Sequence, residues 1–169
     1  RRAVAAGPHP TYLFAPDAGN LAAYQQAVSA TDKATPGFTT AMTSHQVLGS
    51  ESPAGARQIQ VILGGLKELP TLRKGVQARV LTPLEALGAY SQGPAATIKL
   101  FLIQTNTVTP TSQHSPAIGL IATVQAREQL SQETALLAGM LAGHRETAAD
   151  RVAFANMAGA RQTYLHNVN

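Results

Sequence analysis

The chain contains no cysteine, and charged residues occupy only 13% of its 169 positions. The absence of cysteine excludes disulfides, thiolate metal sites and cysteine nucleophiles. Aromatic residues are scarce at 5%, and no uninterrupted apolar run approaches the roughly 20 residues that a membrane span needs. Because so few charges protect the surface against association, we expect much of it to be covered by other subunits, in an oligomer whose unit is a dimer.

The charges that are present are distributed unevenly. Residues 52–127 contain seven basic and two acidic side chains, residues 1–51 are balanced, and residues 128–169 have one more acid than base. The sequence pI is ≈ 9.8, which favours acidic partners. A basic middle region between nearly neutral flanks indicates a surface that meets a polyanion.

The length suits a single domain over residues 1–169. We divide it into an N-terminal arm of loop and helix (1–51), a basic β-sheet (52–127) and a helical tail (128–169). In the arm, a short helix is expected over residues 20–30 with Asn20 as its N-cap. Its apolar side would consist of Leu21, Tyr24 and Val28.

Five segments in and beside the basic region alternate between apolar and polar residues and stop near glycine or proline. They cover residues 38–48, 57–63, 76–81, 97–107 and 118–127. Alternation with a period of two, bounded by turn residues, is typical of half-buried strands. The pattern therefore predicts an antiparallel β-meander.

The polar side of these expected strands combines basic groups with amides and hydroxyls. Such a mixture suits contacts to phosphates and adaptable hydrogen bonds to bases. If the strands pair in sequence, these residues share one face, although an ordinary solvated face would look the same. The predicted RNA-binding residues are Gln77, Arg79, Thr97, Lys99, Thr123, Gln125 and Arg127.

The period changes to that of a helix after Ser131, which is a good N-cap. The apolar side of this helix would include Leu137 and Met140, and Gly143 would interrupt it before a second helix at about 146–160. Two helices that follow a sheet indicate an α+β fold in which the helices cover one sheet face.

The chain has none of the common nucleotide-binding, serine-hydrolase or zinc-protease sequence motifs. Its five histidines are scattered, with no pair at the i, i+4 spacing of a metal site. We therefore expect no enzyme, no metal and no cofactor. A small hydrolase or transferase built around a histidine is an alternative.

The order of these expected elements resembles that of the coat proteins of single-stranded RNA bacteriophages. The stretch TIKLFLIQTNTVTPTSQHSPAIGLIATVQAR is similar to the last two strands of that family, and EQLSQETALLAGMLAG to the helix that follows them. The similarity covers residues 56–160. The chain is longer than the usual member, and its first fifty residues have no counterpart there.

The resemblance implies a dimer with a continuous sheet, whose inner face binds single-stranded RNA and whose copies close into a shell. The expected function is thus a structural capsid protein of a virion, assembled in the host cytoplasm, without membrane or small-molecule partners. The alternative is a structural subunit of another large assembly, such as a phage tail, a secretion system or a membrane complex, without nucleic acid.

Overall fold

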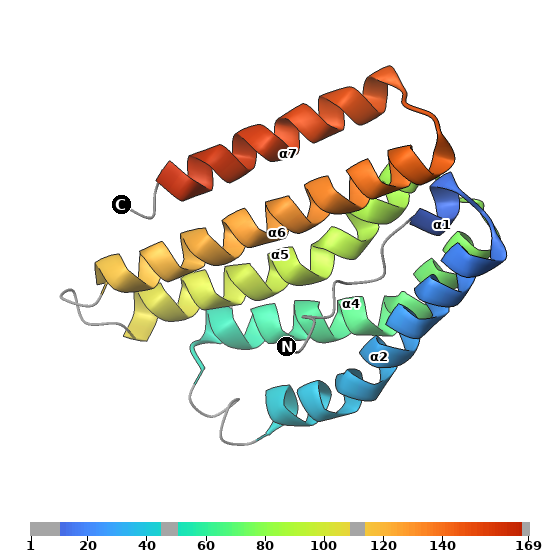
Figure 1. Ribbon diagram of the computed structural model, residues 1–169. Helices are drawn as coiled ribbons and strands as arrows, with labels where there is room; N and C mark the ends of the chain where they lie inside the picture. The colour runs from blue at the N-terminus through green and yellow to red at the C-terminus, as the bar shows by residue number, and fades with distance from the viewer. Residues whose placement is uncertain (1–10, 45–50, 109–113, 167–169) are drawn as a thin grey trace, which may run out of the picture.

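The computed structural model describes residues 11–44, 51–108 and 114–166, and this part of the chain is helical without any strand. The long helices are α2 (Ala18–Thr43), α4 (Pro53–Gln77), α5 (Pro83–Val108), α6 (His114–Gly143) and α7 (Ala148–His166). From α4 onward each packs against the next in chain order, and the single-turn α1 (Thr11–Phe14) lies against α6 near one end of the bundle (Figure 1). The expected α+β fold with a β-meander is therefore wrong.

The strand prediction failed because short windows hid the helical spacing of the buried residues. In α4, Ile59 and Ile62 are almost fully buried, whereas Val61 between them is 59% exposed. The same region continues to Val76, which is fully buried. Within a seven-residue window the exposed Val61 produces an alternating pattern like that of a strand. Over the 25 residues of α4 the buried positions instead recur with the helical period.

The residues read as turns are also part of the helices. Gly64 and Gly65 lie inside α4. Pro83, near which the strand over 76–81 was expected to stop, is the first residue of α5, where the missing proline N–H would have had no helical partner. Pro53 begins α4 in the same way. The expected strand over 38–48 falls partly in α2 and partly outside the described residues.

Two helix starts are closed by reciprocal hydrogen bonds between a threonine and an acid three residues later. Before α5, the backbone N–H of Thr82 donates to Glu85 at 2.7 Å and that of Glu85 donates to the Thr82 hydroxyl at 3.2 Å. Thr147 and Asp150 repeat this arrangement before α7. These capping boxes satisfy N–H groups that a helix leaves open.

A helix covers residues 20–30 as expected, but it is not short, because α2 begins at Ala18 and continues to Thr43. Its N-cap is Asp17, which accepts from the N–H of Asn20 at 2.8 Å. In the tail, the expected break at Gly143 is confirmed, since α6 ends there. Ser131 caps nothing, because it lies within α6. Leu137, expected to be buried, is 45% exposed.

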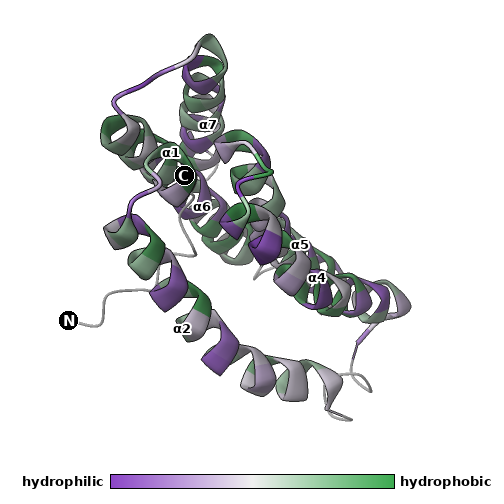
Figure 2. Ribbon diagram, turned by 90° about the vertical axis from the view of Figure 1, so that its right-hand side faces the viewer, coloured by the Kyte–Doolittle hydropathy of each residue, from purple (hydrophilic) through white to green (hydrophobic). Residues whose placement is uncertain are grey.

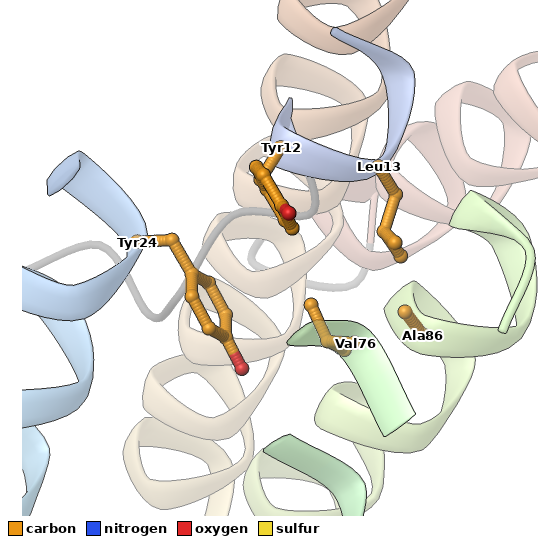
Figure 3. Packing of buried hydrophobic residues seen from close by; sticks show 5 residues of the cluster. All are labelled: Tyr12, Leu13, Tyr24, Val76 and Ala86. Atoms are coloured by element: carbon orange, nitrogen blue, oxygen red, sulfur yellow. The ribbon is translucent and has the colours of Figure 1, made fainter. Parts of the chain in front are cut away.

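The largest shared core joins the beginning of the chain to its middle. Tyr12 and Leu13 of α1 lie beside Tyr24 of α2, Val76 of α4 and Ala86 of α5 (Figure 3). The rings of Tyr12 and Tyr24 stack with their centroids 6.3 Å apart. No helix in the described ranges is both long and apolar enough to cross a membrane.

Three of the long helices carry an internal proline: Pro36 in α2, Pro70 in α4 and Pro94 in α5. Proline cannot donate the helical hydrogen bond and crowds the carbonyl four residues earlier, so it bends a helix. In α2, Thr31 and Thr35 also bond back to the carbonyls four residues before them, which favours bending further. Figure 2 shows α2 curving along the side of the bundle.

We predict that Gly139→Ala destabilises the domain. A Cβ at this position would lie 2.2 Å from Cδ2 of the buried Phe14 ring, so α1 would have to move away from α6. Overpacking of this kind costs about 1–3 kcal/mol, or roughly 2–12 °C in melting temperature, measured by thermal unfolding followed by circular dichroism.

Gly159→Ala is the matched control, because nothing lies within 4 Å of a Cβ at that position in α7. It should leave the melting temperature unchanged or raise it, since alanine is the better helix former. Equal losses for the two variants would contradict the close contact between α1 and α6.

Candidate functional site

A cavity of ≈ 570 Å³ lies among helices α2, α4, α5 and α6. Its walls include the segments around the three internal prolines, and Pro94 itself is part of the lining. Most of the lining is apolar, with Phe38, Ile62 and Leu69 among its residues. Proline removes a helical hydrogen bond, and the cavity lies where these three segments meet.

Arg73 of α4 is the one basic residue among those that line the cavity. It is only 9% exposed, although arginine is rarely buried unless paired. Its Nη1 donates to Oδ1 of Asp32 on α2 at 2.6 Å, and Asp32 is largely exposed. This ion pair connects α2 to α4 beside the cavity.

The other guanidinium nitrogens of Arg73, Nε and Nη2, are buried and have no hydrogen-bond partner in the described part of the chain. These two nitrogens form one edge of the planar group, and their N–H bonds are nearly parallel. A buried donor without a partner costs about 1–3 kcal/mol, and more when it is charged. An anion with two oxygens on one side would satisfy both donors at once.

A pair of tyrosines lies close to this guanidinium. The hydroxyls of Tyr24 and Tyr90 are 2.7 Å apart, and Tyr90 lines the cavity. Burial raises the pKa of both phenols, and for Tyr90 the hydrogen bond to Tyr24 raises the pKa further. The positive charge of Arg73 lowers the pKa of both phenols, but this effect is smaller than that of burial. Both hydroxyls are therefore neutral near pH 7.

Two carboxylates, Glu68 of α4 and Glu128 of α6, also line the cavity. Glu128 accepts a hydrogen bond of 2.9 Å from Nε2 of Gln132, another lining residue. No three histidines or acids in the described ranges are grouped as a metal site would require. The lining therefore combines one guanidinium with two carboxylates and several neutral polar groups, and the guanidinium supplies donors for a small anion.

The seven predicted RNA-binding residues share no sheet face, because they lie on helices or in a turn. Thr97 alone among them lines the cavity, and its hydroxyl donates to the Gly93 carbonyl at 3.0 Å. The role of these seven individual residues in binding stays a prediction. Their positions are the end of α4 (Gln77), the turn after it (Arg79), α5 (Thr97 and Lys99) and α6 (Thr123, Gln125 and Arg127).

Arg73 was counted among the basic charges of the sequence but was not recognised as a site residue. The sequence feature that could have identified Arg73 is a charged residue at a helix position where α4 otherwise has apolar residues. Positions 59, 62, 66, 69, 73 and 76 of α4 follow alternating spacings of three and four, and all but Arg73 are Ile, Leu or Val. Such a pattern is readable only once the segment is taken as a helix. Asp32 has no comparable signal.

The family model described as nitrate and nitrite sensing matches residues 5–169. The chain belongs to this nitrate and nitrite sensing family. Comparison with curated proteins and with solved structures gives no match.

Membership of the nitrate and nitrite sensing family corrects several expectations. The chain is a sensing domain, so its interpretation as a phage coat protein that assembles into a virion is wrong. A structural subunit of another large assembly is not supported either. The expected RNA partner and the expected lack of a small-molecule partner are wrong as well, because the ligands of a nitrate and nitrite sensor are small inorganic anions.

We predict that the tyrosine pair makes this sensing domain sensitive to alkali. The unfolded phenols titrate near pH 10, whereas burial raises their pKa in the folded state. The unfolded chain therefore loses protons that the folded chain keeps, so the stability from the pair is complete below about pH 10 and declines above it. Urea unfolding midpoints measured from pH 8 to 11 should fall less steeply when Tyr24 and Tyr90 are both changed to Phe.

Tyr164→Phe in α7 is the control, because it removes a phenol outside the pair. The double variant should keep most of its stability at pH 8, since replacing both partners of a hydrogen bond by apolar groups leaves no donor unsatisfied. An equally steep decline in the double variant would contradict the role of the pair.

Proposed function

We propose that this chain senses nitrate or nitrite by binding the ion in the cavity, against the Nε–Nη2 edge of Arg73. The observation that carries this proposal is the pair of buried, charged donors without a partner on a residue that lines a cavity. A folded protein rarely leaves such groups unsatisfied, and a bound oxyanion supplies the missing acceptors.

The chemistry of the two ions suits this edge. Nitrate and nitrite are planar, and each presents two oxygens on one side, as a carboxylate does in its bidentate pair with arginine. Gln92 and Gln132 also line the cavity and carry amide N–H groups for a further oxygen. The apolar part of the wall favours ions that give up their hydration easily, because removing water from a charge is costly.

The ion pair between Arg73 and Asp32 offers a route from the ligand to the rest of the chain. An anion on Arg73 partly neutralises the guanidinium and so weakens its attraction to Asp32 on α2. Helix α2 is bent beside the cavity and contacts α4 through this pair. Ligand binding therefore acts most directly on the position of α2.

This role requires no chemistry on the ligand, and we propose that the chain is not an enzyme. We also propose that residues 1–169 act as one domain, since the cavity draws on helices from both halves of the chain. We place the domain in the periplasm, as the sensor part of a bacterial membrane protein.

We predict that Arg73→Lys weakens nitrate binding by at least about tenfold. Lysine keeps the positive charge and can still pair with Asp32, but it lacks the two parallel donors, and a charged hydrogen bond contributes roughly 1.5–3 kcal/mol. Isothermal titration calorimetry with sodium nitrate and sodium nitrite measures the loss, and the ligand-induced rise in melting temperature provides a second readout.

Arg151→Lys is the matched control, because Arg151 is exposed on α7 and pairs with Glu146 at 2.9 Å. This variant should bind nitrate as the unaltered chain does. Unchanged nitrate affinity in Arg73→Lys would place the ligand elsewhere on the domain.

A further inference from the structure

The electrostatics of the cavity are unusual for an anion site, because acids outnumber bases around it. The lining contains the carboxylates of Glu68 and Glu128 against the single guanidinium of Arg73. Asp32, just outside the lining, already compensates part of that one positive charge through Nη1. An entering anion is therefore attracted by the guanidinium of Arg73 and repelled by the carboxylates of the lining and by Asp32.

Repulsion of this kind discriminates between ligands by their charge. The energy of each carboxylate–ligand pair is proportional to the ligand charge, so it doubles for a divalent anion. The desolvation penalty in a mostly apolar cavity rises even more steeply, because the Born energy depends on the square of the charge. A tetrahedral dianion is thus disfavoured by both the repulsion and the desolvation penalty, whereas a singly charged planar ion keeps the bidentate contact.

The guanidinium edge also depends on Asp32 for its orientation. Of the three nitrogens, Asp32 occupies Nη1 and leaves Nε and Nη2, which lie together on one edge, without a protein partner. The flexible arginine side chain is thereby held in one arrangement before the ligand arrives, which reduces the entropy lost on binding.

We propose, on the basis of the function proposed above, that Asp32 and Glu128 determine the specificity of this site. They restrict it to singly charged oxyanions and exclude divalent ones such as sulfate, and Asp32 in addition positions the Nε–Nη2 edge of Arg73. Both carboxylates act through charge, and Asp32 also acts through its hydrogen bond.

The test compares sodium nitrate with sodium sulfate by titration calorimetry at constant ionic strength. The unaltered chain should bind nitrate, and sulfate at least about tenfold more weakly. Asp32→Asn and Glu128→Gln each remove one charge while keeping an oxygen acceptor for Nη1 or for Gln132. We expect each of these two variants to strengthen nitrate binding roughly threefold. The gain in sulfate binding should then be about the square of that factor, because the sulfate charge is twice as large. Raised salt should reduce the gain for either anion.

Two further variants separate charge from position. Glu146→Gln, at the connection between α6 and α7, removes the same charge outside the cavity lining and should change neither affinity. Asp32→Ala removes the hydrogen bond together with the charge, so it should bind nitrate more weakly than Asp32→Asn does.

Equal gains for nitrate and sulfate in the charge variants, or the same change in Glu146→Gln, would overturn the charge filter while leaving nitrate binding at Arg73 intact. Equal nitrate affinity in Asp32→Ala and Asp32→Asn would overturn the positioning role. No nitrate binding to the unaltered chain would overturn the proposed function, and this inference with it.

Discussion

The burial of one guanidinium organises the functional part of this molecule. Arg73 occupies a position of α4 where the helix otherwise turns apolar side chains inward, and it is tolerated there because Asp32 on α2 accepts one of its hydrogen bonds. The ion pair neutralises part of the charge but satisfies only one of the three nitrogens. The incomplete compensation stabilises the fold less than a full network would, and it leaves an edge that a ligand can complete.

The space beside that edge comes from the backbone. Internal prolines interrupt the hydrogen-bond ladders of α2, α4 and α5, and the cavity lies where the segments around them meet. Elsewhere the helices approach closely: Gly139 and Gly143 of α6 allow Phe14 to lie directly on the helix. Tight packing at the α1 end and loose packing around the prolines give one molecule both a rigid core and a binding site.

Much of the local helix chemistry could be predicted from the sequence, whereas the fold class could not. The apolar side formed by Leu21, Tyr24 and Val28 is confirmed, because all three belong to the core that α1 and α2 share with α4 and α5. The basic region was misread because exposed side chains such as Val61 made seven-residue windows alternate. Windows of that length cannot separate a strand from a helix, and Pro83, which begins α5, was taken for the end of a strand.

The sequence by itself determined that thiol chemistry is absent, that charge is sparse, that a helix starts near Asn20 and that another ends at Gly143. These properties depend on composition or on residues within one or two turns. Only the tertiary structure distinguishes Arg73 from the other basic residues of the described ranges. Arg73 is nearly buried, pairs with Asp32 41 positions away and lines a cavity bounded by four helices. The helical spacing of α4 places Arg73 on the inward side, but its partner and the cavity come from segments distant in the chain, and no local pattern encodes those.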